Sequence, residues 1–259
     1  MLISIVTVVL NSEKTISDCL KSVICQKYKF IEHLLIDGGS SDQTLKIVDQ
    51  VGTHLKKIIS EPDNGLYFAM NKGARFASGD VLGFLNADDF YPNPYTLQHV
   101  AGVFSDPCID VCFGDLQYVD RNNPELVRRY WKTGPYLPGR FSLGWAPPHP
   151  SFFVKRDIFA VENGFNTKYK LAADNDFMMR VLECRGYKSH YCPEVFVKMR
   201  VGGKTNKSFY NIILGNQEIF SALKCNGLKT NLFKYILNKV ILRTVQHLYG
   251  LIKNWTISL

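Results

Sequence analysis

Acidic side chains gather in three short segments of this 259-residue sequence, and each segment could take part in catalysis. Asn86-Ala87-Asp88-Asp89 directly follows the apolar run 81–85. Two adjacent carboxylates at a strand end are costly unless positive charge lies beside them, and a hard divalent cation shared with substrate phosphates would supply it. The segment therefore predicts a metal site. The alternative is that Asp88 and Asp89 cap the helix that follows Pro92-Asn93-Pro94.

The second segment, residues 171–177, contains Asp174 and Asp176. A carboxylate here could act as general base on a hydroxyl. Taken alone, the segment is explained better by Asp174 as the N-cap of a helix over 174–185. The third segment, Asp37-Gly38-Gly39-Ser40-Ser41-Asp42, has a glycine pair that lets a ligand approach the backbone, and it is equally an ordinary turn. It is not GxGxxG, so it does not support a dinucleotide-binding fold.

Single residues in and beside the loop 134–150, which carries five prolines and three glycines, could contact a substrate. His149 could touch a phosphate or the acceptor, and the alternative is that it is simply solvated. Trp131, Tyr136 and Trp145 could stack on sugar faces, and they are equally consistent with an ordinary core.

An alternation of strand-like and helix-like stretches positions the acidic segments in the first half. Strand patterns at 2–10, 33–36, 57–60 and 81–85 alternate with helical patterns from about 16, over 42–51 and over 65–78. This order predicts right-handed βαβ units and a parallel sheet, whose ligands bind beyond the carboxyl ends of the strands. The apolar N-terminus is too short to span a bilayer and no basic residue precedes it, which indicates a buried strand rather than a signal peptide.

The second half is less regular. Residues 109–131 are typical of a β-hairpin that turns near 120–124, and residues 206–255 have a helical pattern. One face of this C-terminal tail is apolar and consists of Phe233, Leu237, Ile241, Val245, Leu248, Ile252 and Trp255.

The composition favours a folded cytosolic protein. Hydrophobic residues make up 46% and charged residues 21% of the chain, which is enough for a packed core. The seven cysteines are odd in number and include no CxxC pair, so we expect reduced thiols rather than disulfides or a zinc site. Residues 201–259 hold eight Lys or Arg and one acid, Glu218, whereas the rest is nearly neutral. A nucleic-acid partner is not expected, because the basic character lies in the tail rather than on a folded face.

Taken together and in this order, the segments resemble the family 2 glycosyltransferases, which have the GT-A fold. The resemblance covers roughly residues 2–205. It rests on the strand ending at Asn11, on 36–44, on 60–73, on Asn86-Ala87-Asp88-Asp89, on 173–180 and on Val201-Gly202-Gly203-Lys204-Thr205. The segment 60–73 is similar to a subgroup that builds bacterial surface polysaccharides. Three positions depart from the family pattern: Asn86 where Asp opens the metal motif, Gly38 where a second acid is frequent, and Leu10 where an aromatic is frequent.

The resemblance implies an α/β fold with a Rossmann-like, mostly parallel central sheet over 1–205 and a basic amphipathic helical tail over 206–259. It implies that Asp88 and Asp89 hold Mn²⁺ or Mg²⁺ and that Asp174 is the base of an inverting, single-displacement transfer. Donor contacts are expected from Leu10, Asn11, Asp37, Asp63, Asn71 and Asp88, and acceptor or phosphate contacts from His149 and Asp176.

The implied reaction moves a hexose, by analogy glucose or galactose, from a UDP-sugar to a sugar hydroxyl of a lipid-linked oligosaccharide in O-antigen or capsule synthesis. Two alternatives stay open: a metal-dependent nucleotidyltransferase and a non-catalytic carbohydrate-binding module. The first is disfavoured because residues 9–14 contain no glycine and one lysine, unlike a basic phosphate loop. The second does not explain Asp88 and Asp89 together with Asp174.

The tail suggests where the protein works. Lys239, Arg243 and His247 lie opposite its apolar face, which is the pattern of a helix in a membrane interface. We therefore expect a cytoplasmic protein on the inner face of the cell membrane. The alternative is that the apolar face packs on the catalytic domain, and Lys234 on the apolar side favours it slightly.

Overall fold

The computed structural model describes residues 1–202 and 209–257. Its strands are β1 (Ile3–Val9), β2 (Ile31–Asp37), β3 (Lys57–Ser60), β4 (Val81–Asn86), β5 (Asp89–Phe90), β6 (Val111–Val119), β7 (Val127–Trp131), β8 (Phe152–Lys155) and β9 (Ser189–Arg200). Its α-helices are α1 (Ile16–Ile24), α2 (Thr44–Val51), α3 (Leu66–Phe76), α4 (Thr96–Val103), α5 (Arg156–Val161), α6 (Ala173–Met178), α7 (Phe209–Cys225) and α8 (Leu232–Ile257). Short 3₁₀ turns cover Phe141–Leu143 and His149–Ser151, and a π-helix covers Met179–Cys184.

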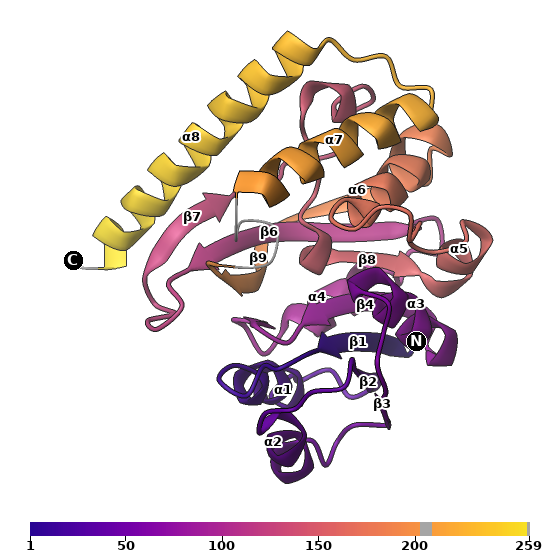
Figure 1. The fold of residues 1–259 in the computed structure, drawn as a ribbon, viewed down its shortest axis with the longest axis vertical. Coiled ribbons are helices and arrows are strands. Elements are labelled where there is room, and N and C mark those ends of the chain that lie inside the picture. The colour runs from indigo at the N-terminus through magenta and orange to yellow at the C-terminus, as the bar shows by residue number, and fades with distance from the viewer. Residues whose placement is uncertain (203–208, 258–259) are drawn as a thin grey trace.

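All the strands form one sheet, in the order β3-β2-β1-β4-β8-β6-β9-β5, with β7 paired to β6 (Figure 1). The first-half strands β3, β2, β1 and β4 are parallel, as the alternating pattern predicts. Strand β8 runs antiparallel to both β4 and β6, and β6 pairs in parallel with β9. The expected α/β sheet is therefore confirmed, with a mixed second half.

The register of the parallel strands brings the polar segments together. Val9 pairs with Asp37, and Val8 pairs with Asn86, so the carboxyl ends of β1, β2 and β4 meet at one edge. The side chains of β1 are buried throughout, because the sheet is covered on both faces. The chain leaves the sheet at this edge through its acidic segments.

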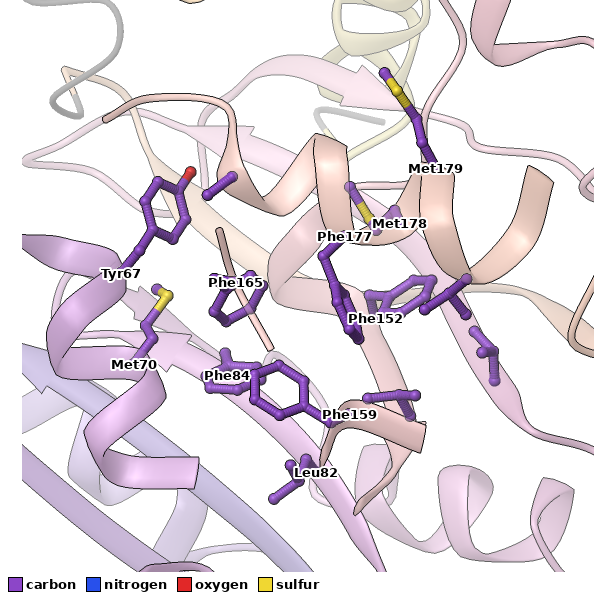
Figure 2. Packing of buried hydrophobic residues seen from close by; sticks show 14 of the residues in the cluster. Tyr67, Met70, Leu82, Phe84, Phe152, Phe159, Phe165, Phe177, Met178 and Met179 are labelled. Atoms are coloured by element: carbon purple, nitrogen blue, oxygen red, sulfur yellow. The ribbon is translucent and has the colours of Figure 1, made fainter. Parts of the chain in front are cut away.

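Aromatic rings fill the core beneath that edge (Figure 2). Phe84, Phe159, Phe165 and Phe177 contact one another with ring centroids 4.9 to 5.4 Å apart, in tilted and edge-to-face pairs. Such pairs add to the free energy gained by burial and restrict ring orientation. Tyr67 of α3 packs on this cluster, with its ring 5.5 Å from that of Phe165. The cluster thus forms a firm base for α3 and α6.

The second half follows its predicted outline with one change. The hairpin is present as β6 and β7, with a register shift at Tyr118 and Val119. The helix expected over 174–185 is α6 continued by the π-helix. Its N-cap residue is Ala172, so the interpretation of Asp174 as the N-cap is wrong. Asp174 lies inside the first turn instead.

The tail is two helices rather than one, and both dock on the remainder of the chain. Helix α7 packs on α6, and α8 runs along the outer strand β7 (Figure 1). The side chain of Asn254 makes the two backbone hydrogen bonds that a neighbouring strand would make with Val127. It accepts the N–H of Val127 at 2.9 Å and donates to the carbonyl of Val127 at 2.7 Å. Gly250 lies so close to β7 that an added Cβ would sit 3.1 Å from Arg129 Cα. The division into 1–205 and 206–259 stays a prediction.

The apolar face of α8 points away from the sheet and is exposed. Phe233, Leu237, Ile241, Val245, Leu248 and Ile252 are each at least 41% exposed, and the side chain of Trp255 lies outside the described residues. The alternative that this face packs on the catalytic domain is therefore wrong for these six residues. None of the helices in 1–202 and 209–257 has the length and apolar character that a bilayer span requires.

Candidate active site

A pocket of about 1100 Å³ is lined by residues at the carboxyl ends of β1 and β4 and by residues from the second half of the chain. Its lining includes Asn11, Asp88 and Asp89, which we call the floor, and also Asp174 and residues of α8. The volume is at the upper end of ordinary small-molecule pockets, so two ligands could occupy it together.

Asp88 and Asp89 lie at the floor in different environments. Asp88 is half-buried, whereas Asp89 is fully buried in β5. Burial, and then the charge of Asp88, raise the pKa of Asp89 well above its usual value. Asn86 Nδ2 donates to Asp89 Oδ2 at 2.9 Å. Neither aspartate caps α4, whose N-cap is Tyr95 without a side-chain cap bond, so the capping alternative is wrong.

These residues fit a hard divalent cation. Asn86 Oδ1 and Asp89 Oδ1 are buried oxygens that find no hydrogen-bond partner among residues 1–202 and 209–257, which is costly in a protein interior unless a positive group binds them. In the part of the chain that the structure describes, no three His, Cys, Asp or Glu side chains are grouped to hold a metal alone. Mg²⁺ and similar ions commonly use one or two carboxylates and complete their shell with substrate phosphates and water.

Leu10 and Asn11 form the pocket wall at the end of β1. Asn11 has a left-handed backbone, with φ of +49°. Its N–H donates to Ser40 Oγ at 2.9 Å, and its Oδ1 accepts the N–H of Ser41 at 2.9 Å. These bonds join the ends of β1 and β2, and they leave the exposed Leu10 side chain to face the pocket.

Asp37 lies below that wall rather than in it. Its oxygens accept from the N–H groups of Gly39 and Ser40 and from Ser60 Oγ, and the residue is fully buried. Gly39 has a φ of +88°, so the glycine pair also serves the turn. Among the described residues that line the pocket, Gly38 is present and Asp37 is not. Asp37 therefore orders the loop, and any influence on a donor would pass through that loop.

Asp63 and Asn71 differ in their access to the main pocket. Asp63 lines both this pocket and a second hollow and is paired with Lys72, and its buried Oδ2 has no hydrogen-bond partner among the described residues. Of the two, Asn71 lines only the second hollow, where its side chain bonds both the N–H and the carbonyl of Phe165 at 2.9 and 2.8 Å. These bonds hold the segment before α6, and the expected donor contact of Asn71 stays a prediction.

Asp174, in α6, lines the same pocket as Asp88 and Asp89. Tyr67 Oη donates to Asp174 Oδ1 at 2.9 Å, and the N–H of Asn175 donates to the same oxygen at 2.8 Å. Burial, and then the charge of Asp174, hold the pKa of Tyr67 well above its usual value, so the phenol stays a donor. The hydrogen bonds to the Asp174 carboxylate from the described residues all end on Oδ1.

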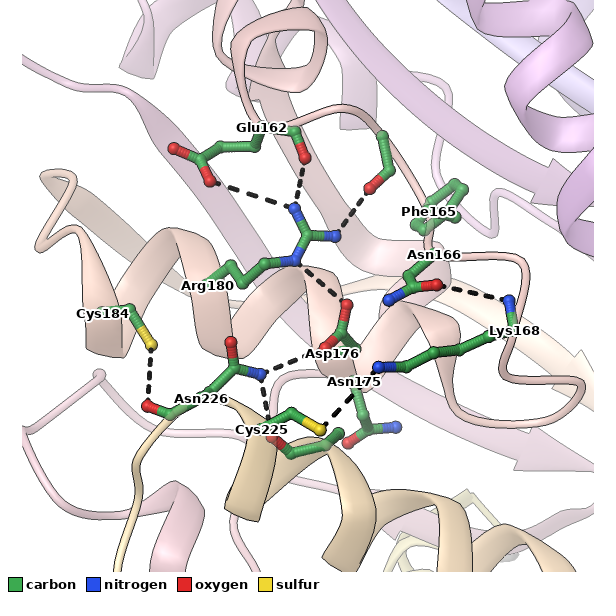
Figure 3. A network of polar contacts seen from close by, with 12 residues as sticks. Glu162, Phe165, Asn166, Lys168, Asn175, Asp176, Arg180, Cys184, Cys225 and Asn226 are labelled. Atoms are coloured by element: carbon green, nitrogen blue, oxygen red, sulfur yellow. Dashed lines mark hydrogen bonds and ion pairs between the residues drawn. The ribbon is translucent and has the colours of Figure 1, made fainter.

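Asp176 points the other way. Arg180 Nε donates to it at 3.0 Å and Asn226 Nδ2 at 3.1 Å, within the network drawn in Figure 3. Arg180 also donates to the carbonyl of Gly164, and Asp176 is almost fully buried. Asp176 therefore holds α6 to its neighbours, and the described lining of the pocket does not include it. The expected acceptor contact of Asp176 stays a prediction.

His149 lies in the pocket lining between aromatic rings. Its ring is 5.6 Å from Phe84 and 5.2 Å from Phe165. Burial lowers its pKa, so the ring is neutral near pH 7, and its buried Nε2 has no hydrogen-bond partner. The interpretation of His149 as simply solvated is therefore wrong. Trp131 and Trp145 line the same pocket.

Comparison with known proteins identifies the family of this chain. The family model described as glycosyl transferase family 2 matches residues 4–189. The chain belongs to glycosyltransferase family 2. A "PGL/p-HBAD biosynthesis glycosyltransferase" of Mycobacterium bovis is 31% identical to it over 181 residues, which are 68% of each chain. An uncharacterized glycosyltransferase of Haemophilus influenzae is 27% identical over 92% of this chain and 75% of that one.

Solved structures share the fold of this glycosyltransferase. S. aureus TarS 1–349 in complex with UDP-GlcNAc matches 87% of this chain and 65% of that chain, with a TM-score of 0.66 and 20% identity. The mannosyltransferase PcManGT of Pyrobaculum calidifontis, in complex with GDP-Man and Mn²⁺, matches 97% and 72%, with a TM-score of 0.65 and 18% identity. This chain spans 39% of the longer TarS chain. The expected GT-A fold is confirmed.

Some residues of the glycosyltransferase site escape sequence reasoning. Tyr67 is one, because its partner Asp174 is 107 residues away. Others are Arg129, Lys239 and Arg243, which line the pocket from β7 and α8. The only signal for them is that Lys239 and Arg243 lie four residues apart, opposite an apolar face.

Proposed function

We propose that this glycosyltransferase moves a hexose, glucose or galactose, from a UDP-sugar to a sugar hydroxyl of a lipid-linked oligosaccharide during assembly of a bacterial surface polysaccharide. The observation that carries the proposal is that Asp174, held by Tyr67, shares one pocket with Asp88 and Asp89. A proton acceptor and a phosphate-binding carboxylate pair then face each other across the space for a sugar.

The proposed reaction is a single displacement with inversion. Asp174 accepts the proton of the acceptor hydroxyl through the oxygen that Tyr67 does not bond. The hydroxyl oxygen forms the new bond to the anomeric carbon as the bond to the diphosphate oxygen breaks, and UDP leaves. A divalent cation bound by Asp88 and Asp89 would stabilise the negative charge on the leaving diphosphate. Tyr67 orients the carboxylate and keeps its proton throughout.

The donor is proposed from the pocket wall and from related proteins. Leu10 and Asn11 offer an apolar surface and a backbone edge of the kind that suits a base and ribose. TarS binds UDP-GlcNAc and PcManGT binds GDP-Man, so nucleotide sugars are the donor class of proteins with this fold. Mn²⁺ accompanies the donor in PcManGT, which supports Mn²⁺ or Mg²⁺ here.

The location at the inner face of the cell membrane is proposed from α8. Its exposed face carries Phe233, Leu237 and Ile241, and no Asp or Glu follows Glu218 in the chain. An apolar face without acidic neighbours suits an anionic bilayer surface, because each nearby Lys or Arg adds about 1 kcal/mol of attraction. A lipid-linked acceptor would be presented at that surface.

A donor panel tests the proposal. The protein is incubated with Mn²⁺, UDP-glucose, UDP-galactose, UDP-GlcNAc or GDP-mannose, and a GlcNAc- or GalNAc-diphospho-lipid acceptor, and nucleotide release and product mass are measured. We expect acceptor-dependent UDP release with one UDP-hexose and a product heavier by one hexose. Release from GDP-mannose alone, or a product with retained anomeric configuration by NMR, would contradict the donor or the mechanism.

A further inference from the structure

Three of the cations that line the pocket come from β7 and α8. Arg129 extends from β7, and Lys239 and Arg243 lie one turn apart on the inner face of α8. We call these three residues the cationic wall. The packing of α8 on β7 brings these three residues together, and this close packing is possible because Gly250 has no side chain.

The cationic wall has no acidic partner. Among the described residues, none of Arg129, Lys239 and Arg243 forms an ion pair with a carboxylate. Arg129 lies 3.8 Å above the Tyr118 ring, and its buried Nε has no hydrogen-bond partner. Lys239 Nζ is met by neutral groups, Asn216 Oδ1 at 2.8 Å and Tyr235 Oη at 3.4 Å.

The three charges also disfavour one another. Burial lowers the pKa of Arg129, and the charge of Arg243 contributes to this shift. Burial, and then the charge of Arg243, lower the pKa of Lys239 to about 8. Arg129 and Lys239 are half-buried and Arg243 is exposed, and like charges held together in this way are unfavourable until an anion joins them. A phosphate group brings about two negative charges and several acceptor oxygens, and therefore suits such a place.

We propose that Arg129, Lys239 and Arg243 form a second phosphate subsite, which binds the phosphate of the acceptor while the donor diphosphate lies at Asp88 and Asp89. The inference rests on the proposed function, because it names the charged part of the lipid-linked acceptor.

Three observations favour the acceptor over the donor as the source of this phosphate. The donor diphosphate already has the metal-binding carboxylates of the floor, and the pocket is large enough for a second ligand. The wall comes from α8 and from β7, and in the sheet β4, β8 and β6 lie between β7 and β1, the strand that ends before Leu10 and Asn11. The opposite face of the same helix α8 is apolar and exposed. A lipid whose tail lies at that surface would therefore have its phosphate close to the cationic wall.

The test measures binding of geranyl diphosphate, a water-soluble prenyl diphosphate, by calorimetry with UDP and Mn²⁺ at saturation. We expect binding to the wild-type protein and at least about tenfold weaker binding to Arg243→Gln and to Lys239→Gln, the loss typical of one charge-assisted hydrogen bond. Geraniol, which lacks phosphate, is expected to bind all three proteins equally.

Two matched controls come from the same elements. Arg128→Gln changes the neighbouring residue on β7, which is exposed and paired with Asp120, and Lys234→Gln changes an exposed lysine of α8. Both are expected to bind geranyl diphosphate as the wild type does. Equal affinity in the wild type and Arg243→Gln would overturn the subsite, and so would competition between geranyl diphosphate and UDP, because the wall would then serve the donor.

The outcome separates the subsite from the proposed function. If no UDP-sugar is turned over but geranyl diphosphate binding depends on Arg243, the subsite stands and the proposed transfer falls. If a phosphate-free sugar acceptor is glycosylated while the wall variants bind geranyl diphosphate normally, the transfer stands and the subsite falls. Should UDP not bind at all, the comparison of variants without UDP decides on the subsite.

Discussion

The carboxylate of Glu218 accepts the backbone N–H of Ala172 at 3.1 Å, and through this bond α7 holds the start of the helix that carries Asp174. The same carboxylate accepts the N–H groups of Lys170 at 2.9 Å and Leu171 at 2.8 Å. Glu218 is the only acid in residues 201–259. The tail thus supplies a negative group to the start of α6, where unpaired N–H groups and the helix dipole favour one.

Replacing Glu218 tests this support. Glu218→Gln loses the charge and one acceptor oxygen, so we expect the free energy of unfolding to fall by about 1.5–3 kcal/mol. We expect kcat to fall because Asp174 is held less firmly, with the donor KM unchanged. Urea denaturation and steady-state kinetics measure the two effects. Glu125→Gln, at an exposed ion pair with Lys198, is the control. An unchanged kcat in a destabilised Glu218→Gln would limit Glu218 to a structural role.

Asp174→Asn is expected to fold and to lose turnover by about 10²–10⁴-fold, as for removal of a general base. Donor binding should persist, because Asp174 is not among the residues proposed to hold the donor diphosphate. Tyr67→Phe removes only the hydroxyl that orients the carboxylate and is expected to cost less than Asp174→Asn. Kinetics and UDP binding by calorimetry check both variants. Near wild-type turnover in Asp174→Asn would mean that the base lies elsewhere.

Asp88→Ala is expected to abolish turnover and metal-dependent UDP binding, since the half-buried Asp88 and the buried oxygens of Asn86 and Asp89 are the proposed cation ligands. Excess EDTA should have the same effect on the wild type, and added Mn²⁺ or Mg²⁺ should restore its turnover and UDP binding. Asp157→Ala, at a highly exposed carboxylate away from the pocket, is the control and should behave as the wild type. Full turnover in excess EDTA would refute the metal dependence.

Charged substitutions on the outer face of α8 test membrane binding. Leu237→Asp with Ile241→Asp places two acids on the exposed apolar face, and we expect recovery with anionic vesicles to fall at least about tenfold at low salt. Turnover on a water-soluble acceptor should not change. Val161→Asp, at an exposed apolar residue of α5, is the control. If wild-type protein stays in the supernatant with anionic vesicles, the membrane proposal is wrong; concentration-dependent dimerisation through this face would replace it.

The pH dependence of geranyl diphosphate binding should report Lys239. Burial, and then the charge of Arg243, place the pKa of Lys239 near 8, below the ordinary lysine value. The ammonium form is therefore present below pH 8 and is lost as the pH rises through that value. We expect the affinity to fall above pH 8 in the wild type and to stay level in Lys239→Arg, whose guanidinium remains charged. Tyr235 and Asn216, which also face Lys239, stay neutral over this range. Identical profiles for both proteins would exclude Lys239 as the titrating group.

The sequence by itself determined the parallel half of the sheet and the position of its polar strand ends. Residue patterns of period 2 and 3.6 are local, and parallel pairing then forces the ends of β1, β2 and β4 to one edge. The placement of Asp88 and Asp174 around one pocket followed from motif order. Asp37 shows the limit: its type and position predicted a donor contact, which stays a prediction, and the sequence did not indicate that its carboxylate accepts the N–H groups of the turn that follows.

Only the tertiary structure decided which polar residues face the pocket and how the tail is turned. Tyr67 meets Asp174 across 107 residues, and Asp176 turns to Arg180 instead, because packing of α6 on its neighbours sets which side of the helix is free. The amphipathic pattern of α8 does not indicate which of its two faces contacts the rest of the protein, because either face could do so. Close approach at Gly250 and the bonds of Asn254 to Val127 turn the basic face inward and leave the apolar face outside.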